Sequence, residues 1–240
     1  MAEICRRLYD RFYLVATDGN VSVRLGEARL LVTPSGVNKG FLGPRDLLVT
    51  DLEGRKVEGE GKPSSELAMH VRAYRERPDI RAVVHAHPAT ATAFACSGLS
   101  LDECLMTEAV VGLGAVPLAP FALPSTAEVP QSIGELIRQT DVLMLANHGV
   151  LTVGASLMDA YNKMESVEQF ARVALTTRLL GGPKLLDRGQ VERLEALRAR
   201  YGLAGKQLSC SRCATAGAPD ETLETIAAQV LQSLFPGRRG

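Results

Sequence analysis

The sequence lacks an excess of charge of either sign, because 27 lysines and arginines balance 27 aspartates and glutamates. Proteins that bind nucleic acids or membrane surfaces usually carry a basic excess, so we expect neither partner. No apolar run approaches the ~18 residues that cross a bilayer, and the charged start MAEICRRLYDRF lacks the apolar region of a signal peptide. We therefore expect a cytoplasmic globular protein, whose 46% hydrophobic residues suffice for a core.

Two tempting motifs are incomplete. The five cysteines are an odd number and do not indicate a disulfide framework. Cys210 and Cys213 have the spacing of a zinc-ligand pair, but no two further ligands lie nearby in the sequence, so free thiols are the expected state. Gly112 and Gly114 begin a dinucleotide-binding pattern, yet Pro117 stands where its third glycine is needed.

The hydrophobic pattern alternates between strands and helices over most of the chain. We predict one catalytic domain over residues 1–203, a flexible linker over 204–219 and an amphipathic helix over 220–240. Strands are expected in the segments NVSVRL, ARLLV, DLLVTD, RKVEG, IRAVVHAH, DVLML and GVLTVG. Helices are expected at 3–14, after Ser64, at the start of PATATAFACSG, at 156–180 and at 188–201.

His85 and His87 are two of only four histidines in the chain. On a strand, residues i and i+2 share a face, and these two are roughly 7 Å apart along it. They could bind one metal ion or be two unrelated histidines. His148 follows a predicted buried strand, and Gly149 beside it would allow close backbone approach. Three imidazoles with an open position are typical of a catalytic metal, with zinc the first expectation and manganese, iron or cobalt also suited.

Polar residues at the predicted helix start suggest a second function for this region. Ser64 and Ser65 could bind an anion such as phosphate at the helix N-terminus, or they could simply cap the helix. Glu66 is stabilised in a first helical turn, but beside a metal it could be a fourth ligand or a general base. Residues of two glycine-containing loops could complete an anion cradle, or could serve ordinary turns: Asn20, Ser35 and Gly36.

Five motifs taken together resemble the class II aldolase/adducin family. GNVSVR, TPSG, PSSE, VVHAH and NHG occur in the family's order and at nearly its spacing. Each motif is weak alone, but the ordered set is specific, and the resemblance covers about residues 4 to 203. It implies an α/β/α sandwich with a central, mainly antiparallel sheet, and a homotetramer with sites between subunits.

The resemblance also implies roles for individual residues. His85, His87 and His148 would hold a divalent zinc ion, with Glu66 as fourth ligand and catalytic acid/base. The substrate phosphate would be bound by Asn20, Ser35, Gly36, Ser64 and Ser65. Tyr201, in RYGL, matches a family tyrosine that reaches into a neighbouring subunit's site. The alternative for Tyr201 is a helix-end aromatic in the core.

One loop departs from the family pattern. The family's aldolases carry a second tyrosine before the segment VP-AP, where this chain has Met106, Thr107 and Glu108. Related dehydratases acting on methylthioribulose 1-phosphate carry a glutamate at nearly this distance after H-x-H. Glu108 could therefore be a second acid/base.

The resemblance implies a metal-dependent aldolase that reversibly cleaves a ketose 1-phosphate to dihydroxyacetone phosphate and an aldehyde. L-Fuculose 1-phosphate and a 5-deoxypentulose 1-phosphate are the expected substrates. Dehydratase, decarboxylase and 4-epimerase chemistries of the same family use the same metal site and remain alternatives. A further alternative is an adducin-like interaction module without catalytic activity.

The helix predicted at 220–240 has two possible roles. After a flexible linker, it resembles peptides that direct enzymes into bacterial microcompartments, where it would contact the shell. Alternatively it docks on its own oligomer or simply frays.

Overall fold

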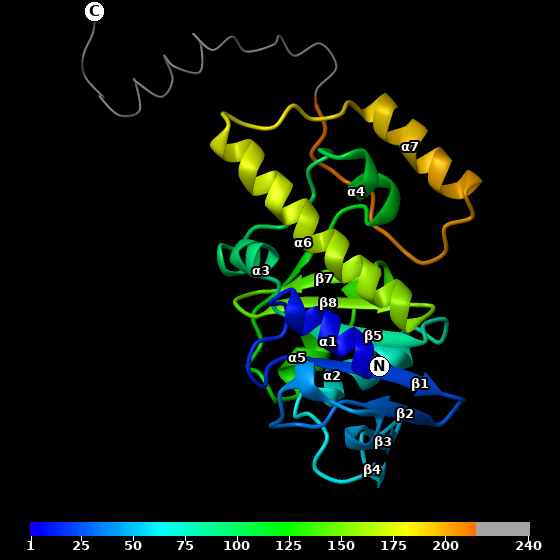
Figure 1. Ribbon diagram of the computed structural model, residues 1–240. Coiled ribbons are helices and arrows are strands. Elements are labelled where there is room, and N and C mark those ends of the chain that lie inside the picture. Colours follow the sequence, from blue (N-terminus) through cyan, green and yellow to red (C-terminus); the bar gives the residue numbers. More distant parts are fainter. Residues whose placement is uncertain (215–240) are drawn as a thin grey trace, which may run out of the picture.

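The computed structural model describes residues 1–214 (Figure 1). Its centre is a mixed sheet in the order β4-β3-β2-β1-β5-β8-β7-β6, in which all neighbours are antiparallel except β6 and β7. The strands are β1 (Asn20–Leu25), β2 (Arg29–Val32), β3 (Leu48–Asp51), β4 (Lys56–Glu58), β5 (Ala82–Ala86), β6 (Leu118–Ala119), β7 (Val142–Leu145) and β8 (Gly149–Gly154).

Helices cover both faces of this sheet. One apolar cluster joins it to α1, α3, α4 and α6, and a second joins it to α2 and α5. The helices are α1 (Ala2–Asp10), α2 (Leu67–Glu76), α3 (Ala89–Cys96), α4 (Thr107–Gly112), α5 (Glu128–Ile133), α6 (Leu157–Leu179) and α7 (Arg188–Arg200). The predicted α/β/α sandwich with a mainly antiparallel sheet is confirmed. No helix of the described residues is long and apolar enough to span a membrane.

The central strand β5 shows how the sequence sets the two faces. Val84 and Ala86 pack into the cluster with α6, whereas Val83 packs into the cluster with α2. This alternation follows from the two-residue period of a strand. His85 has the parity of Val83 and therefore points to the α2 side. All five residues of β5 are buried, which is why β-branched and small side chains dominate it.

The start of α2 differs from the prediction. The helix begins at Leu67, so Ser64 and Ser65 lie in the turn before it rather than at its cap. Ser64 Oγ instead accepts from the Glu66 backbone N–H at 3.2 Å. This local bond holds residues 64–66 in a turn before the helix.

The predicted flexible linker is in part ordered. Of its residues, 204–214 are described, and they pair with the domain through Ala115 and Leu208 and through a disulfide between Cys104 and Cys213. Free thiols were expected for Cys210 and Cys213; Cys210 is free and Cys213 is not. The prediction failed for Cys213 because its partner lies 109 residues away. Residues 215–219 and the predicted helix at 220–240 lie outside the described residues.

Candidate active site

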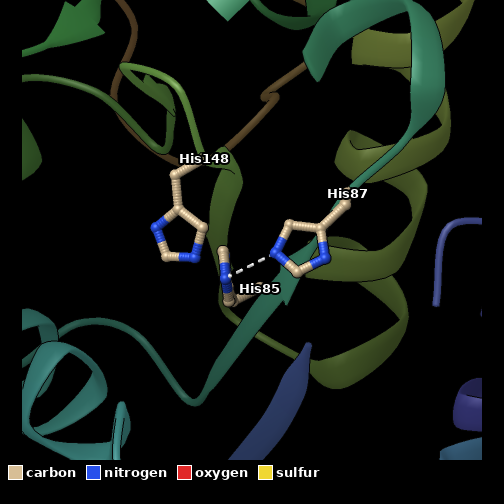
Figure 2. A group of neighbouring side chains, drawn as sticks. All are labelled: His85, His87 and His148. Carbon is tan, nitrogen blue, oxygen red and sulfur yellow. Dashed lines mark hydrogen bonds between the residues drawn. The ribbon is translucent and has the colours of Figure 1, made fainter. Parts of the chain in front are cut away.

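Three histidines converge where β5 and β8 lie side by side. Figure 2 shows His85, His87 and His148 pointing toward one another, and one ligand nitrogen from each lies within 4.8 Å of the others. His85 Nε2 and His87 Nε2 are 3.2 Å apart. We call these three residues the histidine cluster. It unites both sequence motifs, VVHAH and NHG.

Glycine at position 149 makes this approach possible. A Cβ there would lie 2.5 Å from His87 Cδ2 and 2.7 Å from the Ala86 carbonyl oxygen, closer than real Cβ contacts. The turn before it places Asn147 at a φ of 56°, a left-handed conformation that asparagine tolerates better than most residues. The tight turn and the bare glycine together bring His148 back over β5.

The protonation of the histidine cluster suits metal binding. His85 Nδ1 lies 2.9 Å from the Val150 carbonyl oxygen, which can only accept, so Nδ1 carries the proton and Nε2 presents a lone pair. Burial lowers the pKa of His85 to about 4. Burial and the neighbouring His85 and His148 lower the pKa of His87 to about 3. Both rings are therefore neutral near neutral pH and ready to act as ligands.

Glu66 completes the set of donors. Its Oε1 lies 3.1 Å from His148 Nε2 and its Oε2 lies 3.6 Å from His85 Nε2. Burial acts to raise the pKa of Glu66, but the hydrogen bond to His148 and electrostatic interaction with the His85 and His148 rings lower it overall. Asn20 Nδ2 donates to Glu66 Oε2 at 2.9 Å and fixes the carboxylate. Three imidazoles and a carboxylate fit the donor set of a catalytic zinc-type ion.

A cavity of about 320 Å³ opens beside this cluster. All five residues predicted to bind phosphate line it: Asn20, Ser35, Gly36, Ser64 and Ser65. Glu66, His87 and His148 line it as well, so the predicted metal and anion groups share one space. Gly36 has a φ of 72°, and a Cβ at this position would meet no atom within 4 Å. The glycine therefore serves the turn of its loop toward the cavity, which a residue with a side chain would adopt only under strain.

The sequence reasoning missed Lys39. Its side chain lines the cavity, is buried, and donates a hydrogen bond to the Thr17 carbonyl oxygen. Burial lowers the pKa of Lys39, and the nearby Asp18 and Glu66 charges oppose that shift. Its position within the glycine-rich loop after β2 was the sequence signal that could have identified this lysine. The Lys39 ammonium group would provide a positive charge for an anionic group of a substrate.

Two predicted catalytic residues do not join the cavity. Glu108 is an exposed residue in the first turn of α4, and Tyr201 is 69% exposed at the end of α7. Neither is among the residues that line the cavity in the described part of the chain. Tyr201 is thus not a core aromatic within its own subunit.

The fourth histidine, His70, lies near the site but contacts other residues. His70, one turn into α2, is buried and its Nδ1 lies 2.7 Å from Ser22 Oγ, which also contacts Tyr74 Oη at 3.0 Å. Burial lowers the pKa of His70 to about 4, so the ring is neutral. It lies one turn after Glu66 and is not a member of the histidine cluster.

Comparisons with known proteins identify the family. The family model described as Class II Aldolase and Adducin N-terminal domain matches residues 1–175. The chain belongs to this family. The L-fuculose phosphate aldolase of Methanococcus maripaludis is 36% identical over 171 residues, 71% of this chain and 92% of that protein. A solved L-fuculose 1-phosphate aldolase superposes with a TM-score of 0.76 at 30% identity, covering 82% of this chain and 92% of that one.

A relative named for another activity is almost as similar to this chain as the aldolases are. The 3-oxo-tetronate 4-phosphate decarboxylase of Haemophilus influenzae is 34% identical over 181 residues, 73% of this chain and 85% of that protein. The family and these relatives make the chain an enzyme of the lyase class. Class II aldolases depend on a metal, and the histidine cluster is where the chain could bind it.

Proposed function

We propose that this enzyme cleaves a ketose 1-phosphate, such as L-fuculose 1-phosphate or a 5-deoxypentulose 1-phosphate, to dihydroxyacetone phosphate and an aldehyde. The observation that carries the proposal is that Glu66, His87 and His148 line the same cavity as the predicted phosphate-binding residues. A substrate with a phosphate at one end and oxygens for a metal a few bonds away fits this arrangement. Relatives at 36% identity are named L-fuculose phosphate aldolase.

The residues divide the work between holding and reacting. His85, His87 and His148 would hold a divalent ion, zinc by preference, and Glu66 would be its fourth ligand in the resting site. When bound, the ion would supply Lewis-acid stabilisation of the substrate oxygens. The five predicted phosphate-binding residues and Lys39 would fix the phosphate end, which converts remote binding into correct orientation.

Glu66 would move the proton at C3. As the C3–C4 bond breaks, the electron pair stays with C3 and the C4 hydroxyl loses its proton to form the aldehyde. Glu66 would take up a proton from solvent when substrate binds and deliver it to C3, from a position that Asn20 holds by a 2.9 Å hydrogen bond. Tyr201 or Glu108 of a neighbouring subunit would accept the C4 hydroxyl proton, consistent with their exposure in the single chain. This assignment requires the homo-oligomer, a tetramer, that the family resemblance implies.

The test is a coupled assay for dihydroxyacetone phosphate with a panel of ketose 1-phosphates and metal-replete enzyme. Product from at least one of them, lost on chelation and regained with zinc, is expected. The variant Lys39→Met, which has a side chain of similar size without the charge, should raise KM for phosphorylated substrate by about tenfold or more. The reason is the loss of one charge-assisted hydrogen bond to the substrate phosphate. No product from any of the panel would contradict the aldolase proposal.

Decarboxylation of a phosphorylated 3-oxo acid is the second candidate. It is favoured by the 34% identical decarboxylase relative and by Met106, Thr107 and Glu108 in place of the aldolase tyrosine. The same metal and phosphate residues would serve, because both reactions leave an electron pair beside a carbonyl. Release of carbon dioxide from a 3-oxo-tetronate 4-phosphate, measured beside the aldolase panel, separates the two. Dehydratase and 4-epimerase activities would appear as substrate loss without either product. An adducin-like module would show no turnover at all, which the lyase relatives make the least favoured outcome.

A further inference from the structure

Three cysteines from two segments that are far apart in the sequence meet beside α7. Cys104 lies in the loop before α4, and Cys210 and Cys213 lie in the segment after α7. One sulfur from each lies within 4.8 Å of the others. We call these three residues the cysteine cluster. It is separate from the histidine cluster and shares no residue with the substrate cavity.

The surroundings hold the three sulfurs in place. Cys104 and Cys210 are buried with Val110 and Val191 in a small apolar core, against which Cys213 packs. The Cys104 N–H donates to the Arg212 carbonyl oxygen at 2.9 Å, and its own carbonyl accepts from the Leu186 N–H at 2.7 Å. The backbone on either side of the sulfurs is therefore fixed by hydrogen bonds, as a preformed ligand site requires.

We propose that the cysteine cluster is a second metal site, which binds a soft divalent ion such as zinc through three thiolates when the disulfide is reduced. Zinc–sulfur bonds of ~2.3 Å in a tetrahedron separate the sulfurs by about 3.8 Å, which the observed 4.8 Å limit accommodates. Cys210 and Cys213 have the two-residue spacing of zinc ligand pairs. Cys213 is only half-buried, so water can reach the fourth position.

A disulfide alone leaves Cys210 unexplained. The bond between Cys104 and Cys213 uses two sulfurs, and the third sits buried beside them. A bound cation would engage this third sulfur as well, because a coordinating thiol is deprotonated outright. Metal binding thus gives all three sulfurs one role.

The metal form and the disulfide form exclude each other. A dithiol reductant supplies two electrons and two protons, which give Cys104 and Cys213 thiols while the reductant closes its own disulfide. The ion then displaces one proton from each of the three thiols into solvent. In either form the segment after α7 stays linked to the loop before α4. The site would therefore serve to fasten the C-terminal part of the described chain to the catalytic domain.

Cobalt distinguishes this site from the histidine cluster. The full-length protein is reduced with a phosphine, stripped with a chelator and titrated with Co²⁺ in the absence of oxygen. We expect one ion at the histidines and a second at the cysteines, the second marked by a thiolate-to-cobalt charge-transfer band in the near ultraviolet. Nitrogen and oxygen ligands produce no such band. Cys210→Ser should lose the second ion and the band while keeping the first ion.

Two controls make the result decisive. Cys210→Ser leaves both disulfide partners intact, so the oxidised variant can fold, and Cys96→Ser changes an exposed cysteine of α3 outside the cluster. Cys96→Ser should keep both ions and the band. Mass spectrometry after alkylation should show the three cluster cysteines protected by the ion in reduced wild type. A reduced wild type that binds no second ion and shows no band, or equal alkylation with and without ion, would overturn the proposal.

Discussion

The histidine cluster and the cysteine cluster place their ligands in opposite ways. His85 is inside a paired strand, with Asn20 opposite it on β1 and Leu151 opposite it on β8. His87 directly follows β5, and His148 directly precedes β8. The cysteines lie on irregular segments, and Cys104 and Cys210 are themselves two of the four buried residues of their small core. Ligands on or directly beside paired strands are fixed by the whole sheet, whereas ligands on loops depend on the cross-link that they themselves form. The first arrangement suits chemistry, and the second suits fastening.

The two clusters also differ in their relation to the family. The family model ends at residue 175 and so includes the complete histidine cluster, but of the cysteine cluster it includes only Cys104. The other two cysteines belong to the part of the chain beyond the match. α7 in that part buries a single residue, Val191, so it contributes little apolar area of its own. A cross-link compensates for this small core in the way that small domains use disulfides or metals.

The largest effect is expected from His148→Ala. This change removes one proposed ligand and also the 3.1 Å partner of Glu66, so both metal binding and the position of the carboxylate should be disturbed. We expect kcat/KM to fall by more than about 10⁴-fold, because the Lewis-acid contribution alone is several kcal/mol. Metal content by plasma mass spectrometry should fall at the histidine cluster while reduced protein keeps the cysteine-bound ion. Loss of both ions would show that the clusters are not independent.

Glu66→Gln should separate proton transfer from metal binding. The amide keeps the shape and the contact with Asn20 but cannot carry the proton, so kcat should fall by about 10² to 10⁴-fold. The three histidines remain, and metal content should therefore stay near that of wild type. A Glu66→Gln enzyme with normal turnover would remove Glu66 from its proposed role and leave it as a stabilised residue before α2.

Tyr201→Phe tests whether the active site is completed by a second subunit. We expect kcat to fall by about 100-fold, the lower end for an acid–base group, with unchanged metal content. Mixing inactive Glu66→Gln and Tyr201→Phe subunits should then restore part of the activity, because some hybrid sites carry both native residues. Glu108→Gln, tested in the same mixture, decides between the two side chains. Mixtures without any recovered activity would indicate that each subunit acts alone.

Sequence reasoning succeeded where spacing alone determines geometry. His85 and His87 share a side because of the strand period, and Gly149 was expected to allow close approach beside His148. The five residues predicted to bind phosphate do line one cavity, although the start of α2 at Leu67 shows that the predicted helix began too early. These features depend on neighbours within a few residues, which is the range over which sequence patterns act.

Features that depend on distant contacts were not predicted. Lys39 lines the cavity because its loop folds against Thr17, a contact between residues distant in the sequence. Cys104 meets Cys213 across 109 residues, and no spacing rule connects them. The helices α4 and α5 were missed because they have only six residues each, too few to show a clear helical period. Glu108 was noticed by its distance from the histidine motif, but its exposure on α4 could not be foreseen.

The pair Gly149→Ala and Gly112→Ala should show how tightly the sheet holds the histidine cluster. At 149 the new methyl group meets His87 and the Ala86 carbonyl, so the free energy of unfolding should fall by about 1–3 kcal/mol. Metal affinity should fall with it. Gly112 has open space within 4 Å, and alanine in that helix should be neutral or stabilising by up to about 1 kcal/mol. Denaturant titration of both variants measures the difference, and equal values would contradict the packing argument.

The smallest effect on catalysis is expected from Cys104→Ser. The histidine cluster does not rely on this cross-link, so turnover should stay within about twofold of wild type, as expected for distant independent sites. The free energy of local opening of α7 should instead fall by about 2 kcal/mol or more, since a cross-link closing a long loop is lost. Hydrogen exchange resolved by peptide measures this opening in α7 and in β5 together, with Cys96→Ser as control. Faster exchange confined to α7 and the segment after it would support two separately stabilised regions, whereas faster exchange in β5 would show that the cysteine cluster also supports the active site.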